Sequence, residues 1–335
     1  MEKKELEKEQ VLVTGGAGFI GHHLVKQLCN LNKRVYVVDD NSAAVTNITA
    51  WNDYKVREIL PQMLEYYDVS NDPMDPDVVY LFCDYSNNSI VKLIKTGKIK
   101  TVFHLAAKPR VEWSVENPIE STNENFSKVL FLMKACADTN TRFVFSSTAA
   151  VYGDCNLPTK ETDETNPKSP YGMAKLCVEK YMELFGDLYG LDWAALRYFN
   201  VYGPAQPGDS AYSTVVSAWC NKAIIGDPLR SDGDGTQTRD MVYVDDVVSA
   251  NIAVAEQQNL ETYRIFNVAT GKRISNNQIR QIFINRGYSK VDQAPERQGD
   301  IKHTLADIQR LKSIGWSPKV DFEEGLQAVF KYWGI

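Results

Sequence analysis

The chain has 335 residues, of which 44% are hydrophobic and 24% charged, as in an ordinary globular protein with one large or two modest domains. Its formal net charge of −6 argues against a broad basic surface for nucleic acid or an anionic membrane. We find no run of about 18 apolar residues, and residues 1–10 are highly charged and predict a flexible tail. Six scattered cysteines and four histidines without ligand spacing predict free thiols, no metal site and a cytoplasmic location.

Apolar runs and helical repeats alternate along the first 200 residues. Residues 11–13 predict a strand, the spacing of apolar residues predicts a helix over 19–31, and residues 34–39 predict the next strand. The polar stretch 41–77 is expected to be an inserted loop with some helix. The same pattern continues with strands expected at 78–83, 101–105, 142–146 and 193–197 and helices at 90–95, 117–140 and 170–189.

This alternation predicts an α/β fold with a Rossmann-like doubly wound parallel sheet. After about Asn200, prolines and glycines divide the chain into shorter elements. We therefore expect a first, Rossmann-like domain over 1–198 and a smaller mixed α/β domain over 199–335 that would hold most of a substrate site. Some segments of the second part could return to the first domain.

A glycine-rich loop follows the first expected strand. Gly15, Gly18 and Gly21 have the spacing G-x-x-G-x-x-G, which lets the backbone approach a pyrophosphate at the start of a helix. Asp39 ends the next strand, where a carboxylate accepts hydrogen bonds from ribose hydroxyls and repels a 2′-phosphate. The loop thus predicts a dinucleotide and favours NAD over NADP, and Asp84 is placed to contact the adenine. A tight turn without a ligand is the alternative.

A tyrosine and a lysine stand four residues apart in the helix expected at 170–189. Lys175 would lie on the same helix face as Tyr171, where a cation favours the phenolate and lowers the pKa of the tyrosine. Such a phenolate can take the proton of a sugar hydroxyl. Thr148, after the strand at 142–146, is expected to share that proton because ligands bind beyond the carboxyl ends of parallel strands. Taken one at a time, Tyr171 and Lys175 could be a pair on the surface of a helix, and Thr148 could belong to a polar turn.

Eight runs resemble the extended short-chain dehydrogenase/reductase family, in its nucleotide-sugar epimerase and dehydratase branch. These runs are TGGAGFIG (14–21), HLAA (104–107), SVENP (114–118), SSTAAVYGD (146–154), SPYGMAK (169–175), LRYFNVYGP (196–204), RDMVYVDDVV (239–248) and ERQGDIKHTLAD (296–307). The 4,6-dehydratases of that branch carry Asp-Glu after the threonine, where this chain has Ala149 and Ala150. The glutamate usual in nucleotide-glucuronate decarboxylases is also missing. The resemblance therefore implies a UDP-sugar 4-epimerase.

The resemblance also implies roles for individual residues. Thr148, Tyr171 and Lys175 would be catalytic, and tightly bound NAD would accept a hydride from C4 and return it to a transient 4-keto sugar. The residues implied to bind NAD are Gly15, Gly18, Phe19, Ile20, Gly21, Asp39, Asp40, Asp84, Tyr85, Leu105, Ala106, Ala107, Asn125, Ser146, Tyr171, Lys175 and Tyr198. The residues implied to bind the UDP-sugar are Arg110, Ser147, Thr148, Asn200, Ala211, Tyr212, Arg239, Arg297, Asp300 and Thr304.

Two positions bear on which sugar is accepted. Thr304 aligns with a wall position that is a bulky tyrosine in epimerases restricted to unacetylated sugars, which favours UDP-N-acetylglucosamine and UDP-N-acetylgalactosamine, with UDP-glucose and UDP-galactose also accepted. Arg110 departs from the small residues usual there and keeps UDP-glucuronate as an alternative. Thr304 could instead only pack, Arg110 could be a surface charge, and Arg239 could pair with its neighbour Asp240.

Other activities of this fold stay open. A 4,6-dehydratase or 4-reductase would yield a deoxy or keto product or consume reduced cofactor, and a non-enzymatic NAD-binding regulator would not require Tyr171 and Lys175. The resemblance further implies a homodimer, built as a four-helix bundle from the helices at 117–140 and 170–189 of two copies. Those helices could instead simply cover the sheet.

Overall fold

The computed structural model describes residues 8–64, 66–68, 71–208, 214–260, 262–296 and 301–335. The chain forms two compact units, the first made of residues 1–146 and 174–195 and the second of residues 147–173 and 196–335. The second unit thus takes a segment from the middle of the chain in addition to the C-terminal part. Among the described residues, no helix is long and apolar enough to cross a membrane.

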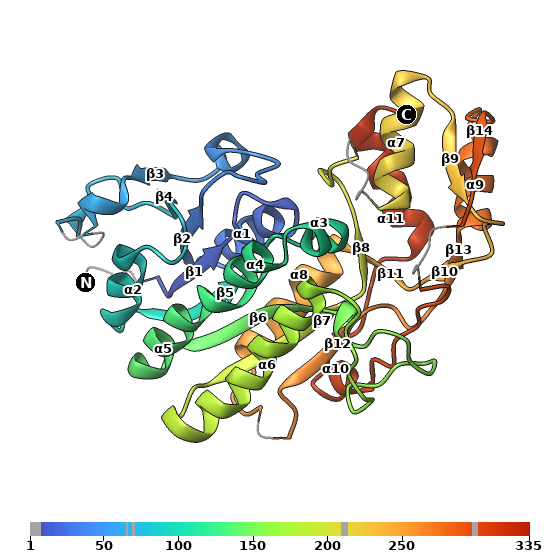
Figure 1. Ribbon diagram of the computed structural model, residues 1–335. Helices are drawn as coiled ribbons and strands as arrows, with labels where there is room; N and C mark the ends of the chain where they lie inside the picture. Colours follow the sequence, from blue (N-terminus) through green and yellow to red (C-terminus); the bar gives the residue numbers. More distant parts are fainter. Residues whose placement is uncertain (1–7, 65, 69–70, 209–213, 261, 297–300) are drawn as a thin grey trace. The chain divides into compact units, whose positions relative to one another are not determined.

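The parallel sheet predicted from the alternation is confirmed. Among the described residues it has eight strands in the order β12-β7-β6-β5-β1-β2-β4-β3 (Figure 1). Strand β1 pairs in parallel with β2 on one side and β5 on the other, so the direction in which the chain adds strands reverses between β1 and β5, where such sheets bind ligands. The strands are β1 (Gln10–Thr14), β2 (Arg34–Asp39), β3 (Val56–Ile59), β4 (Val78–Phe82), β5 (Ile99–His104), β6 (Arg142–Thr148), β7 (Trp193–Tyr198) and β12 (Ile265–Val268).

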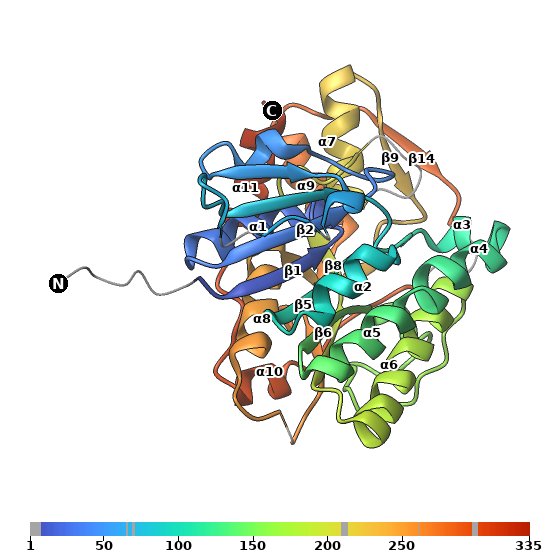
Figure 2. The ribbon, with the colours of Figure 1, turned by 90° about the vertical axis from the view of Figure 1, so that its left-hand side faces the viewer.

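Helices cover the strands of the first unit. Figures 1 and 2 both show α2, α5 and α6 following one another along one side of the sheet. The apolar strands β1 and β2 are completely buried, because a parallel sheet is covered on both faces. The helices here are α1 (Phe19–Asn30), α2 (Asn88–Lys95), α3 (Val111–Glu116), α4 (Pro118–Thr122), α5 (Val129–Thr139) and α6 (Pro170–Tyr189).

Two expectations about these elements need correction. The polar stretch 41–77 contains a strand, β3, which pairs in parallel with β4 and extends the sheet by one edge strand. The pattern of this strand is half-polar because only Ile59 is buried. The helix expected over 117–140 is interrupted, since a π-helical segment at Asn123–Ser127 separates α4 from α5. Such π segments are often found at functional sites.

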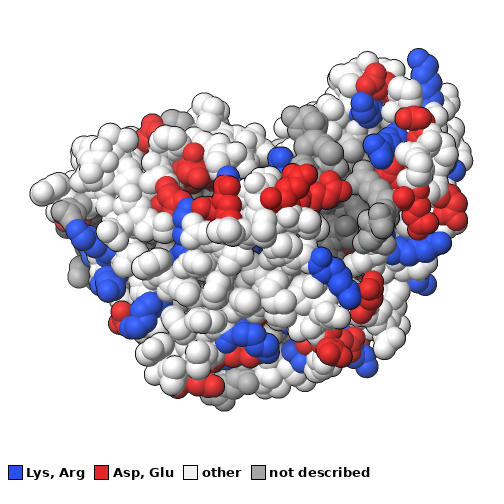
Figure 3. Space-filling view, in the orientation of Figure 1, with Lys and Arg blue, Asp and Glu red and all other residues white. Residues whose placement is uncertain are grey.

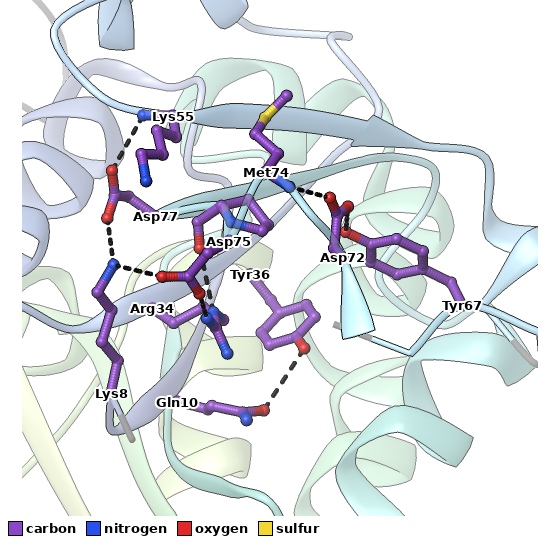
Figure 4. A network of polar contacts seen from close by, with 11 residues as sticks. Lys8, Gln10, Arg34, Tyr36, Lys55, Tyr67, Asp72, Met74, Asp75 and Asp77 are labelled. Carbon is purple, nitrogen blue, oxygen red and sulfur yellow. Dashed lines mark hydrogen bonds and ion pairs between the residues drawn. The ribbon is translucent and has the colours of Figure 1, made fainter. Parts of the chain in front are cut away.

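A polar network ties the inserted stretch to the start of the sheet (Figure 4). The Lys8 ammonium lies 2.7 Å from Asp77, whose other oxygen accepts a hydrogen bond from the Lys55 backbone at 3.0 Å. Arg34 pairs with Asp75. Farther along the insertion, Asp72 accepts hydrogen bonds from Arg57, Tyr67 and the Met74 backbone. Ion pairs and hydrogen bonds therefore hold this segment together with the buried side chains of Trp51 and Ile59.

The described C-terminal part of the second unit, after residue 196, consists of short strands and five α-helices. Strand β8 pairs with β11 and β9 with β14 in parallel, and β10 pairs with β13 in antiparallel orientation. Its core includes Trp219, Phe283 and Phe330, whose rings meet edge to face. The elements are β8 (Asn200–Tyr202), α7 (Val215–Ile225), β9 (Leu229–Asp232), β10 (Thr238–Arg239), β11 (Met241–Tyr243), α8 (Val244–Glu256), β13 (Ile274–Ser275), α9 (Asn276–Asn285), β14 (Val291–Ala294), α10 (Gln309–Ser313) and α11 (Phe322–Trp333).

Candidate active site

The glycine-rich loop joins β1 to α1 with almost no room for side chains. Gly15 has a φ of 70°, and a Cβ there would lie 2.6 Å from the Ala106 nitrogen. A Cβ on Gly21 would lie 2.0 Å from the Gly15 carbonyl oxygen. Gly18 is the N-cap of α1 and offers no side chain to the first-turn N–H groups. Phe19 and Ile20 form that turn, and a helix N-terminus without a side-chain cap suits the binding of an anion.

Carboxylates stand at the ends of the two neighbouring strands. Asp39 is buried and accepts hydrogen bonds from the Ala17 nitrogen at 2.9 Å and the Asn41 nitrogen at 2.8 Å. Burial raises the pKa of Asp39, while those two bonds act in the opposite direction. The adjacent Asp40 is exposed. Asp39 therefore fixes the glycine loop to the β2 end, in addition to the ribose contact expected of it.

The β4 end carries Asp84 and Tyr85. Asp84 accepts bonds from the Ser86 nitrogen at 2.8 Å and from the Lys128 ammonium at 2.7 Å. Burial acts to raise the pKa of Asp84, but the bonds to Lys128 and Ser86 outweigh it and hold the pKa below its ordinary value. Tyr85 is buried, and its hydroxyl donates to the carbonyl of Glu124 in the π-helical segment. Both residues thus connect this strand end to the helical segment that follows α4.

The segment after β5 contains Leu105, Ala106 and Ala107, which are all half-buried. The Ala106 nitrogen donates to the Thr14 hydroxyl at 3.3 Å, and the Lys108 nitrogen donates to the Asn125 side-chain oxygen at 3.0 Å. The Asn125 amide also donates to the Ser121 carbonyl at 2.9 Å. Asn125 was expected to contact the cofactor, and the structure uses its side chain to fix the backbone of this loop.

Sequence reasoning assigned no role to His104, which ends β5. Its Nδ1 lies 2.8 Å from the Thr14 hydroxyl, and its ring stacks on Phe145 at a centroid distance of 5.9 Å. Burial lowers the pKa of His104 well below its usual value, and the positive charge of Lys175 acts in the same direction. A neutral imidazole therefore supports the segment after β5. Its position directly before Leu105-Ala106-Ala107 was the available signal.

Lys175 is almost completely buried on α6. Its ammonium donates to the Ser146 carbonyl at 2.9 Å and lies 4.5 Å from the centroid of the Phe145 ring. Ser146 is itself buried at the end of β6. Burial lowers the pKa of Lys175 to about 7, while the charge of Glu179, one helical turn further, acts to raise it. Lys175 can therefore gain or lose a proton near neutral pH.

Tyr171 and Thr148 come together in the second unit. Tyr171 is 8% exposed near the start of α6, and its hydroxyl is hydrogen-bonded to the Thr148 side chain. The Thr148 hydroxyl also accepts a bond from the Ala150 nitrogen at 3.2 Å, which fixes its orientation after β6. Ser147 beside it is buried. Tyr198 is close enough to influence the pKa of Tyr171, and its own hydroxyl is bonded to Asn251 at 2.9 Å.

The expectation that the pKa of Tyr171 is lowered is wrong when only the groups of the protein are considered. Burial raises the pKa of Tyr171 to about 12, and the hydrogen bond with Thr148 only partly offsets this. A phenolate was expected because Lys175 follows at i+4. Burial disfavours the charged form of each side chain, and this effect is larger than the attraction between the two charges. The tyrosine is therefore neutral and the lysine near its midpoint at pH 7.

Some of the substrate residues expected in the second unit are linked by hydrogen bonds, and others lie outside the described residues. Asn200 begins β8, and its side-chain oxygen lies 3.5 Å from the Thr304 hydroxyl. Arg239 ends β10 and donates to the carbonyls of Thr238 at 3.0 Å and Lys302 at 3.2 Å. Arg110, in the first unit, is exposed at the N-cap of α3. Four expected residues lie outside the described residues: Ala211, Tyr212, Arg297 and Asp300.

Known proteins resemble this chain over nearly its whole length. A family model described as the NAD dependent epimerase/dehydratase family matches residues 11–269. The solved structure of UDP-N-acetylglucosamine 4-epimerase from Methanobrevibacter ruminantium M1, in complex with UDP-N-acetylmuramic acid, is 34% identical, covers 98% of both chains and has a TM-score of 0.85. That of UDP-glucose 4-epimerase with UDP-glucose from Thermotoga maritima is 32% identical, covers 97% of this chain and 98% of its own, and has a TM-score of 0.84.

A further similar protein is the UDP-glucuronate 4-epimerase of Thermodesulfobacterium geofontis, which is 32% identical over 325 residues, 94% of this chain and 93% of its own. The family match, the sheet order and the similarity over nearly the whole chain agree with the resemblance inferred from the sequence motifs. The chain belongs to the NAD-dependent epimerase/dehydratase family.

Proposed function

We propose that this protein is a UDP-sugar 4-epimerase that uses tightly bound NAD. The observation that carries the proposal is the hydrogen bond between Thr148, at the end of β6, and Tyr171, on the helix that also carries Lys175. NAD fits the first unit, since the crowded glycines leave only backbone for a pyrophosphate and Asp39 stands at the β2 end for a ribose. Phe19, Ile20, Asp40 and Tyr198 complete the cofactor contacts that we propose.

Tyr171 is the proposed acid and base at the C4 hydroxyl of the sugar. NAD held by the glycine loop and Asp39 would supply reversible hydride acceptance at C4, so that no net oxidation would result. Tyr171 must lose its proton to act as the base, and Thr148 is placed to share that proton. Lys175 has a pKa near 7 and can release or take up a proton at physiological pH. Catalysis then rests on proton transfer and orientation.

Epimerisation is favoured over dehydration by the two residues directly after Thr148. A dehydratase needs an acid and a base that act on neighbouring carbons of the sugar. Ala149 and Ala150 occupy the turn directly after β6, and neither methyl group can transfer a proton. The same turn binds its threonine through a backbone nitrogen instead. A 4,6-dehydratase or a 4-reductase is therefore the less supported activity.

For the sugar, we favour UDP-N-acetylglucosamine and UDP-N-acetylgalactosamine, with UDP-glucose and UDP-galactose as further substrates. Thr304 is small and half-buried, which leaves room for an N-acetyl group at C2. A 34% identical structure is that of a UDP-N-acetylglucosamine 4-epimerase, which agrees with this choice. Thr304→Tyr should suppress turnover of the N-acetylated sugars and spare plain hexoses. Thr304→Val lacks the hydroxyl but keeps the volume, so it separates the effect of side-chain size from that of hydrogen bonding. Equal loss of turnover on both sugar classes in Thr304→Tyr would contradict the assignment.

UDP-glucuronate remains the second candidate substrate. Arg110 presents a guanidinium beyond the β5 end, which suits a carboxylate at C6. A UDP-glucuronate 4-epimerase is 32% identical to this chain. Arg110→Ala would then reduce turnover of UDP-glucuronate much more than turnover of UDP-glucose.

We also propose a homodimer that uses α5 and α6. Phe131, Leu184, Leu188 and Tyr189 are 45–61% exposed, which is unusual for apolar side chains on neighbouring helices. Figure 3 shows a broad uncharged area over these helices. Two copies that pair these faces would form a four-helix bundle and bury the apolar side chains.

The first experiment is an NMR assay of the purified protein with UDP-N-acetylglucosamine, UDP-glucose and UDP-glucuronate, first without added cofactor and then with NAD. We expect the C4 epimer of at least one sugar and no net change in reduced nicotinamide absorbance. A keto or deoxy product, or turnover that requires added reduced cofactor, would contradict the epimerase assignment.

A further inference from the structure

Asp240 is a completely buried carboxylate that the proposed reaction does not use. It lies between β10 and β11, and its side chain accepts four hydrogen bonds. Three come from the loop after β12: the Thr270 nitrogen at 2.8 Å, the Thr270 hydroxyl at 2.7 Å and the Gly271 nitrogen at 3.0 Å. The fourth comes from the Ala306 nitrogen at 3.1 Å. One side chain therefore joins three segments that lie far apart in the sequence.

The backbone of Asp240 is bonded to two of the proposed substrate residues. Its nitrogen donates to the Thr304 hydroxyl at 3.1 Å, and its carbonyl accepts from the Asn200 nitrogen at 3.2 Å. The Thr304 hydroxyl in turn lies 3.5 Å from the Asn200 side-chain oxygen. Arg239 directly precedes Asp240 in the chain. Three of the residues expected to bind the UDP-sugar, Asn200, Arg239 and Thr304, are thus bonded to or adjacent to one buried aspartate.

We propose that Asp240 is a positioning residue that sets Asn200, Arg239 and Thr304 for the UDP-sugar, an inference that rests on the proposed function. Its carboxylate anchors the backbone around Ala306, two residues beyond Thr304, and its own backbone aligns Thr304 with Asn200. All four partners of the carboxylate are neutral donors, so the arrangement depends on hydrogen-bond geometry. Loss of a carboxylate oxygen would leave buried donors unpaired, and the three segments would separate.

The test compares Asp240→Asn with Asp246→Asn. Asp246 is also buried in the second unit and accepts bonds from the Lys319 nitrogen at 2.8 Å and the Val320 nitrogen at 3.1 Å, but its described bonds reach none of the proposed substrate residues. An asparagine keeps the shape of the side chain and replaces one acceptor oxygen by a donor. UDP binding is measured by calorimetry, below the unfolding temperature of each variant, together with NAD content and the UDP-N-acetylglucosamine to UDP-glucose turnover ratio.

Asp240→Asn should weaken UDP binding by about tenfold or more and leave NAD content unchanged. It should also reduce the difference in turnover between UDP-N-acetylglucosamine and UDP-glucose. Asp246→Asn should lower thermal stability with less than about a twofold change in UDP affinity, because the broken bonds lie outside the substrate residues. Equal UDP affinities for the two folded variants would overturn the positioning role while the proposed function stands. A wild-type protein that neither binds nor epimerises any UDP-sugar overturns the proposed function, and this inference with it.

If Asp240→Asn does not fold, Thr304 supplies the decisive pair. Thr304→Ser keeps the hydroxyl that accepts from Asp240 and reaches Asn200, whereas Thr304→Val removes it at similar volume. Weaker UDP binding by Thr304→Val alone supports the inference. Equal affinities for Thr304→Ser and Thr304→Val overturn it.

Discussion

The proposed cofactor half-site in the first unit and the proposed substrate half-site in the second are built in opposite ways. Gly15, Gly18 and Gly21 lie within seven residues, and their fit depends on close backbone contacts within the loop and with Ala106 after β5. Asn200, Asp240 and Thr304 are spread over more than 100 residues and meet only through hydrogen bonds between distant segments. The first half-site has its glycines in one short motif and is sensitive to added side-chain atoms. The second half-site is assembled from distant segments and is sensitive to the loss of single hydrogen-bond partners.

The largest effect should come from Tyr171→Phe. Because the hydroxyl is the proposed acid and base, kcat should fall by about a thousandfold or more, whereas the NAD content of the purified protein should stay the same. NMR detection of the C4 epimer and release of the cofactor by denaturation measure the two quantities. Turnover within about tenfold of wild type would mean that another group transfers the proton.

Gly15→Ala tests the steric character of the first half-site. The new Cβ would lie 2.6 Å from the Ala106 nitrogen, so we expect NAD affinity to fall by about a hundredfold or more. Gly97→Ala is the matched control, since Gly97 has nearly the same φ, 72°, but nothing within 4 Å of the added carbon. Both variants carry the backbone strain of a positive φ, which costs about 1 kcal/mol, and only Gly15→Ala adds crowding. Similar NAD affinities for the two variants would show that crowding at Gly15 does not limit NAD binding.

The pKa of Lys175 predicts how stability depends on pH. Lys175 ionises with a pKa of about 7 in the folded protein, against 10.5 for the unperturbed side chain. Between these values the unfolded chain binds the extra proton, so the contribution of this lysine to folding becomes more favourable as the pH rises from 7 towards 10. The stability of wild type relative to Lys175→Met should rise by up to about 1.4 kcal/mol per pH unit. Urea unfolding at pH 7, 8 and 9 measures it, and a constant difference would mean that Lys175 stays protonated when folded.

The smallest effect on chemistry should come from the proposed dimer face. Leu188→Glu places a charge on a side chain that is 60% exposed on α6, so a dimer should become a monomer with little change in kcat. Leu31→Glu is the control, because Leu31 is 41% exposed at the end of α1. Light scattering gives the mass of each variant. A wild-type protein that is monomeric at assay concentration would contradict the dimer proposal directly.

The sequence was sufficient for the parts whose structure depends on neighbouring residues. The glycine loop, the strand ending at Asp39 and the helix Pro170–Tyr189 lie where they were expected, because backbone conformation, a strand end and helical spacing are local properties. The doubly wound sheet results from their alternation. The motif at Tyr171 and Lys175 could likewise be identified without the fold.

Only the tertiary structure decided the remaining features. Strand β3 exists because β4 offers it an edge, and the expected helix at 117–140 is interrupted where Tyr85 and Asn125 connect the π-helical segment to neighbouring strand ends and loops. Whether the pKa of Tyr171 is raised or lowered depends on burial, which sequence spacing does not reveal. Asp240 appeared in the sequence only as a neighbour of Arg239, since its four partners come from segments 30 to 66 residues away. Desolvation and long-range hydrogen bonds are properties of the packed chain, and they arise only after distant segments have come together.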